Sequence, residues 1–134
     1  MFASKVIYII DDDRDDQDFL IEVLIEIDST FQCFTANNGQ EGLQKLNNGL
    51  IPFPSLIFLD LNMPRFNGRR FINDIKEDAH FASIPVIIYT TSLYQKDKDE
   101  LKTMGVVAYV EKQADPFVLK ELLSGILSSI LSTN

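Results

Sequence analysis

The sequence predicts a doubly wound α/β domain, in which five parallel strands form one sheet with helices on both of its faces. Short apolar runs alternate along the chain with stretches in which apolar residues recur at helical spacing. Strict alternation of strand and helix favours parallel strands joined by right-handed crossovers. The apolar runs are rich in Ile, Val and Leu without polar alternation, which is typical of strands buried on both faces.

The five predicted strands are the apolar runs bounded by polar or turn-forming residues. Asn37, Asn38 and Gly39 close the second strand, and Pro85 opens the fourth. The strands are expected at residues 5–10, 32–36, 56–60, 86–89 and 106–110.

Helices are predicted between these strands and after the last one. The first extends from Arg14 to about Asp28, and Asp115 followed by Pro116 indicates an N-cap and first position for the last, which runs nearly to Asn134. The others are expected around residues 43–46, around residues 71–75, and over residues 93–104 up to Gly105. Four acids near the start of the first helix are expected to be solvent-exposed carboxylates that favour the helix dipole and have no role in a site. They are Asp13, Asp15, Asp16 and Asp18.

Polar residues follow the strands at the edge where parallel sheets bind ligands. This topology brings Asp11, Asp12, Asp60, Thr90 and Lys112 to one edge. Crowded carboxylates repel one another, and a hard cation such as Mg²⁺ removes the conflict by taking their oxygens as ligands. Asp60 could then attack phosphorus to form an aspartyl phosphate, with Lys112 and Thr90 stabilising the phosphoryl oxygens.

Composition limits the classes of function. The formal net charge of −8 argues against nucleic-acid binding, which needs basic patches. No apolar stretch reaches the roughly 18 residues that a membrane span requires. The single cysteine, Cys33, has no internal disulfide partner, so we expect a cytoplasmic protein. We expect one domain over residues 1–134, with no effector domain.

Four segments of the chain, in this order and spacing, resemble the receiver domain of two-component response regulators along almost the whole length. They are Ile9–Asp13, Leu59–Pro64 with Gly68, Pro85–Ser92 and Ala108–Lys112. The resemblance implies the flavodoxin-like strand order 2-1-3-4-5. It also implies that Asp60 accepts a phosphoryl group from a histidine kinase or a histidine phosphotransfer protein.

The metal site is implied in the same way. Asp12 and Asp60 would bind Mg²⁺ directly, together with the backbone carbonyl of Asn62, and Asp11 would act through a metal-bound water.

The resemblance also implies a switch. Thr90 and Lys112 would contact the phosphoryl group, and Tyr109 would change rotamer in step with Thr90. This change would remodel the face formed by the fourth helix, fifth strand and fifth helix, and so alter contacts with a downstream protein or a second copy of the chain. The chain departs from the family at Gln113, where proline is usual. A cis bond without proline costs about 2.5–4 kcal/mol, so a trans bond or an altered loop is expected.

Two other functions compete with this prediction. One is a phosphatase that uses Asp60 as nucleophile, but Asn62 stands where such enzymes carry a general acid. The other is an adaptor of receiver fold that is never phosphorylated, against which the acidic pair, Thr90 and Lys112 all count.

Overall fold

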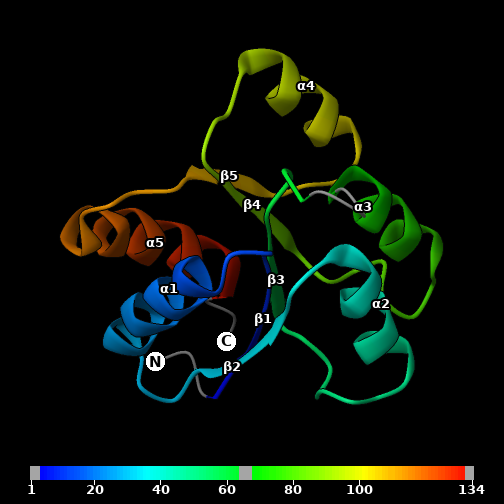
Figure 1. Ribbon diagram of the computed structural model, residues 1–134, viewed down its shortest axis with the longest axis horizontal. Coiled ribbons are helices and arrows are strands. Elements are labelled where there is room, and N and C mark those ends of the chain that lie inside the picture. Colours follow the sequence, from blue (N-terminus) through cyan, green and yellow to red (C-terminus); the bar gives the residue numbers. More distant parts are fainter. Residues whose placement is uncertain (1–3, 64–67, 132–134) are drawn as a thin grey trace.

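The computed structural model describes residues 4–63 and 68–131 and confirms the predicted architecture there (Figure 1). Five parallel strands form one sheet in the order β2-β1-β3-β4-β5, as expected. Their bounds are β1 Val6–Ile10, β2 Gln32–Ala36, β3 Leu56–Leu59, β4 Val86–Thr90 and β5 Ala108–Glu111. Pro64 of the motif and the predicted helix end near Asn134 lie outside the described residues.

Helices cover both faces of the sheet, because alternate strand residues point to opposite sides. Ile7 and Ile9 pack under α1 (Arg14–Ile27) and α5 (Pro116–Leu131). Tyr8 and Ile10 belong to the second core, which the other three helices cover. Figure 1 shows α1 and α5 together on one side of the sheet and α2 and α3 on the other. The helices of the second face are α2 Gly39–Asn47, α3 Gly68–Glu77 and α4 Gln95–Thr103.

Side-chain caps determine where several helices begin. Asp13 accepts a hydrogen bond from the Asp16 amide at 3.1 Å at the start of α1. Asp115 accepts one from the Phe117 amide at 2.9 Å, which confirms it as the cap of α5. Gly105 has φ +87°, a backbone conformation that favours glycine, and it follows the end of α4 as predicted. The caps of α1 and α5 thereby define where the loops that follow β1 and β5 end.

Several element boundaries differ from the sequence prediction, among them three in β3, β4 and β5. Strand β5 begins at Ala108 instead of Val106, because the Val106 amide donates to the Leu101 carbonyl at the end of α4. Thr90 lies inside β4, and Asp60 directly follows β3 instead of ending it. The Asp60 amide still donates to the Ile10 carbonyl at 3.0 Å, which fixes its backbone beside β1.

Two further expectations can be compared with the described residues. None of their peptide bonds is cis, so the bond between Lys112 and Gln113 is trans, one of the two outcomes expected. No helix in this part of the chain combines the length and apolar character needed to cross a membrane.

Candidate functional site

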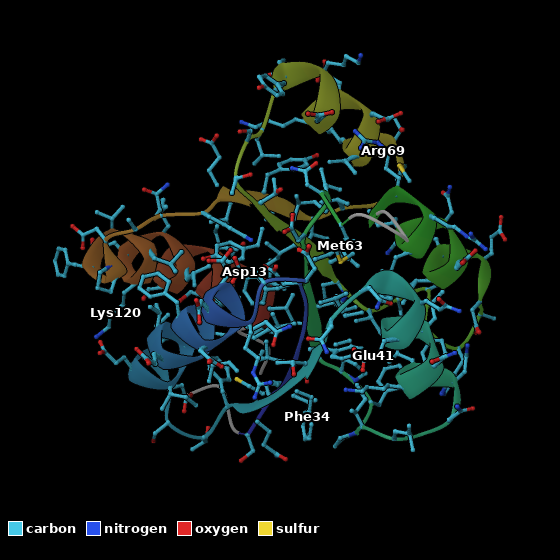
Figure 2. All side chains as sticks on the ribbon, in the orientation of Figure 1. Asp13, Phe34, Glu41, Met63, Arg69 and Lys120 are labelled. Carbon is cyan, nitrogen blue, oxygen red and sulfur yellow. The ribbon has the colours of Figure 1, made fainter. Side chains whose placement is uncertain are left out.

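Three carboxylates meet at the carboxyl edge of the sheet, where β1 and β3 end side by side. Asp11, Asp12 and Asp60 each offer an oxygen within 4.8 Å of the others. Asp11 and Asp60 are only 1% and 6% exposed, whereas Asp12 is exposed. In Figure 2 this edge is marked by Asp13, at the start of α1. The fold therefore brings together the acidic residues that the sequence placed there.

The Asp60 carboxylate is oriented by donors from neighbouring segments. Its Oδ1 accepts hydrogen bonds from the Asn62 amide at 3.0 Å and the Thr90 hydroxyl at 2.8 Å. The Asn62 side-chain amide donates in turn to the Thr90 hydroxyl at 3.1 Å. Oδ2 accepts from the Lys112 ammonium at 3.1 Å. Because Thr90 is fully buried in β4, these contacts give the carboxylate one defined orientation.

Lys112 is the cation of the site and is shared among carboxylates. Its Nζ lies 2.7 Å from Asp16, 2.8 Å from Asp11 and 3.1 Å from Asp60. Burial lowers the pKa of Lys112, but its close contacts with Asp11 and Asp16 and the charge of Asp60 outweigh this effect, so the pKa is raised. The ammonium therefore stays charged at neutral pH.

The charged form of the buried Asp11 carboxylate is energetically unfavourable. Burial raises the pKa of Asp11 to about 6, although Lys112 and the Asp13 amide oppose the rise. Its buried Oδ2 is close enough to Lys112 for an ion pair but has no aligned hydrogen bond. A divalent cation would supply the missing partner and neutralise the repulsion with Asp60, so the residues present fit such an ion.

Gln17 is a supporting residue that the sequence reasoning missed. It is 2% exposed, and its side-chain amide donates to the carbonyls of Asp11 at 2.6 Å and Ala36 at 3.2 Å. It thereby joins the ends of β1 and β2 beneath the acidic loop. A polar residue on the apolar face of α1, one turn before Leu20, was the available signal.

Gly68 gives the loop after Asp60 room to pack against α3. A Cβ there would lie 3.0 Å from both the Asp60 carbonyl oxygen and the Leu61 Cα. Since both atoms belong to the backbone, they cannot rotate away as a side chain would. Glycine is needed here for close approach.

Asp16 lies in the first turn of α1, as expected of an acid that favours the helix dipole, but it is less exposed than predicted and contacts the lysine of the site. It is half-buried in the first turn of α1, and its Oδ2 accepts a hydrogen bond from Lys112 at 2.7 Å. The two residues are 96 positions apart in the sequence. No local pattern could have paired them.

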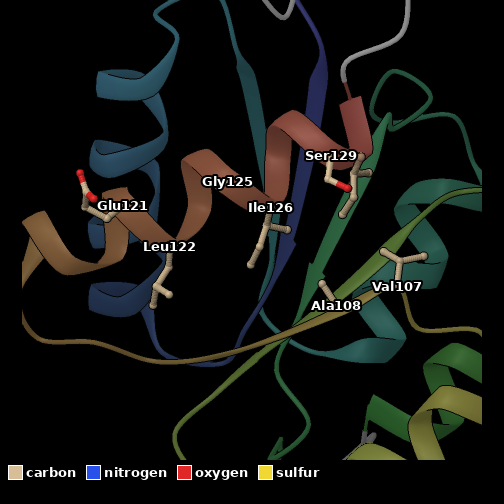
Figure 3. A pocket seen from close by; sticks show the side chains of 8 residues that line it. Val107, Ala108, Glu121, Leu122, Gly125, Ile126 and Ser129 are labelled. Carbon is tan, nitrogen blue, oxygen red and sulfur yellow. The ribbon is translucent and has the colours of Figure 1, made fainter.

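Tyr109 lies away from the acidic group. Its hydroxyl donates to the Lys98 carbonyl at 2.9 Å and so connects β5 to α4. A groove of about 460 Å³ opens on the other side of β5, against α5 (Figure 3). None of the predicted site residues lines it; its lining includes Val107, Leu122, Gly125 and Ile126. This groove and the acidic site are therefore separate.

Comparison with known families agrees with this geometry. The model of the response regulator receiver domain matches residues 7–124. The chain belongs to this family, whose members are signalling domains of two-component systems.

Individual relatives are similar over most of the chain. The response regulator Rcp1 from Synechocystis is 29% identical over 133 residues, covering 96% of this chain and 90% of Rcp1. Against the response regulator Rre1 from the same organism, the chain is 28% identical and spans 46% of the relative's length.

Solved structures show the same fold. The phosphorylated cyanobacterial phytochrome response regulator RcpA aligns with a TM-score of 0.85 and 29% identity, covering 97% of this chain and 96% of RcpA. The Mn²⁺-bound form of Rcp1 aligns with a TM-score of 0.81 and 30% identity over the same shares of the two chains.

Proposed function

We propose that this protein is a phosphoacceptor switch in which Asp60 receives a phosphoryl group from a partner's phosphohistidine. Receiver domains are phosphorylated by histidine kinases or histidine phosphotransfer proteins. The observation that carries the proposal is the Asp60 carboxylate, which is 6% exposed and contacted by Thr90, Asn62 and Lys112. A carboxylate so confined beside a lysine is suited to act as a nucleophile.

In the proposed reaction an Asp60 oxygen attacks phosphorus. The new P–O bond forms while the donor's P–N bond breaks, and the imidazole nitrogen leaves with the electron pair and takes a proton from water. Lys112 places positive charge beside the phosphoryl oxygens, and the Thr90 hydroxyl offers them a hydrogen bond. Both groups are already at Asp60, so little reorganisation is required. Hydrolysis of the aspartyl phosphate resets the site.

We assign the cation to Mg²⁺, bound directly by Asp12, Asp60 and the Asn62 carbonyl, and by Asp11 through a water. The support is the oxygen-rich acidic group and the buried Asp11 Oδ2 without an aligned hydrogen bond. Mn²⁺ binding by the relative Rcp1 is consistent with a divalent ion. When bound, the cation supplies neutralising charge to the carboxylates and to the transferring phosphoryl group.

We propose that the output is a change in protein–protein contacts at the face of α4, β5 and α5. Thr90 and Tyr109 are the switch residues in this proposal, supported by the contacts of Thr90 with Asp60 and of Tyr109 with α4. Exposed apolar side chains on this face, Tyr94, Phe117 and Leu122, suit a downstream protein or a second copy of the chain. The proposal treats residues 1–134 as one receiver unit, in the cytoplasm where its free Cys33 stays reduced.

Intact mass after incubation with acetyl phosphate and Mg²⁺ tests the proposal. We expect wild type to gain one phosphoryl group, only when Mg²⁺ is present, and Asp60→Asn to gain none. Asp15→Asn serves as a control variant, since it makes the same change at an exposed position of α1, keeps Asp60 and is expected to gain the phosphoryl group. No adduct on a folded, metal-binding wild type would contradict the proposal and favour an adaptor. Continuous release of phosphate from many unrelated phosphate esters would favour a phosphatase.

A further inference from the structure

The ion pair between Asp16 and Lys112 is not used by the reaction described above. Asp16 comes from α1 and stands outside the acidic group that fits a cation. It nevertheless has the shortest of the three contacts with the Lys112 ammonium, at 2.7 Å. The Asp16 side chain is 36% exposed, while that of Lys112 is 11% exposed.

We propose that Asp16 is a positioning residue that competes with the phosphoryl group for Lys112. It holds the ammonium toward α1 in the unphosphorylated protein and must release it, at least in part, when phosphoryl oxygens arrive. This inference rests on the proposed phosphorylation of Asp60.

Competition follows from the number of acceptors around one ammonium. A lysine has three N–H donors, and Asp11, Asp16 and Asp60 already surround it at 2.7–3.1 Å. With a cation engaging Asp11 and Asp60, Asp16 is the remaining anion that draws Lys112 away from the phosphoryl oxygens. Its negative charge also repels an incoming dianion at short range.

Release of Asp16 does not require Lys112 to leave the site. The ammonium also lies 5.6 Å from the centre of the Tyr89 ring, and Tyr89 is 2% exposed. Tyr89 and Asp11 therefore keep it near Asp60 when Asp16 is neutralised. An ion pair with one partly exposed member is weak enough to open.

The test uses isothermal titration calorimetry to measure how tightly the full chain binds beryllium fluoride at saturating Mg²⁺. Beryllium fluoride mimics the phosphoryl group on a carboxylate. Asp16→Asn is expected to bind it about fivefold more tightly than wild type, the scale set by a partly exposed ion pair. Asp15→Asn removes the same charge from the same turn, from an exposed position, and is expected to change binding less than twofold. Asp16→Glu, which keeps the charge, should restore wild-type affinity.

A second readout is independent of the phosphoryl group. In a double-mutant cycle of urea unfolding with chelator present, Asp16→Asn should change stability in wild type but not in a Lys112→Met background. An Asp16→Asn affinity equal to that of wild type or of Asp15→Asn, or weaker than wild type, would overturn the inference. If wild type itself gains no phosphoryl group from acetyl phosphate, the proposed function fails instead, which the mass measurement detects separately.

Discussion

The carboxyl edge of the sheet and the groove beside α5 are unusual in opposite ways, because the edge buries charged groups and the groove exposes apolar ones. At the edge, the nearly buried carboxyl groups of Asp11 and Asp60 lie around Lys112. Along the groove, apolar side chains are left in water, with Val107 51% and Leu122 43% exposed. Burying charge and exposing apolar surface both work against stability. The contrast fits the proposed function, in which the acidic edge carries the chemistry and the groove lies on the face that contacts another protein.

A glycine in each region shows how differently the two are packed. Gly68 lies against the backbone of Asp60 and Leu61, where an added Cβ would find atoms at 3.0 Å. Gly125 lines the groove, and an added Cβ would find nothing within 4 Å. The backbone that follows Asp60 is therefore closely packed, whereas the groove has space for atoms of another molecule.

Matched alanine substitutions at these glycines test the contrast with the largest expected effect. Gly68→Ala should lower the free energy of unfolding by about 2–3 kcal/mol, because the added methyl group overpacks against backbone. Gly125→Ala should raise it by about 0.5–1 kcal/mol, because alanine is the better helix residue in an open position. Urea denaturation measures both. Equal changes in the free energy of unfolding for the two substitutions would show that the surroundings of Gly68 and Gly125 are packed alike.

The buried charge of Asp11 should make metal-free stability depend on pH. Because the pKa of Asp11 in the folded protein is about 6, above the unfolded value of 3.8, its charged form opposes folding at neutral pH. Its contribution to stability is full below the unfolded pKa and is lost as pH rises through about 6. From pH 7 to pH 5, wild type should therefore gain about 1 kcal/mol relative to Asp11→Asn.

Urea unfolding of both proteins with chelator present measures this difference. Saturating Mg²⁺ should reduce it, because the bound cation keeps the carboxylates ionised. Parallel pH profiles for wild type and Asp11→Asn without metal would show that the acidic site carries no such strain.

The smallest expected effect concerns Tyr109, which connects β5 to α4 between the two regions. Tyr109→Phe removes the hydrogen bond to the Lys98 carbonyl and should lower the free energy of unfolding by about 0.5–1 kcal/mol. The substitution should leave labelling of Asp60 by acetyl phosphate intact, because Tyr109 contacts no acidic residue of the site. Loss of labelling in a stable Tyr109→Phe protein would show that the phosphoacceptor site depends on this contact.

Arg69 does not belong to either region but ties α3 to α4 through Asp97 and Glu100, and Figure 2 shows it next to α4. All three side chains of these pairs are partly exposed, Arg69 at 35%, Asp97 at 23% and Glu100 at 53%. Such pairs contribute little to stability, so α4 is secured mainly by Leu101, which is fully buried. The proposed switch therefore moves α4, a helix with few buried residues.

Much of the fold followed from local pattern because each strand is a short apolar run and each crossover needs a helix. The predicted edge residues Asp11, Asp60, Thr90 and Lys112 do meet in space, since parallel strands end at one edge of a sheet. Boundaries such as the start of β5 were less predictable. There the Val106 amide donates to α4 instead of to the sheet. The apolar sequence around Val106 does not reveal which of the two hydrogen bonds forms.

The sequence by itself determined the alternation of strands and helices along the chain, the polar residues at one edge of the sheet and the resemblance to a family. It could do so because periodicity and spacing are local properties. Only the tertiary structure decided the partners of Lys112. The three carboxylates around it come from the end of β1, the first turn of α1 and the end of β3. Contacts between residues as far apart as Asp16 and Lys112 depend on how helices pack on the sheet, and no local pattern encodes that packing.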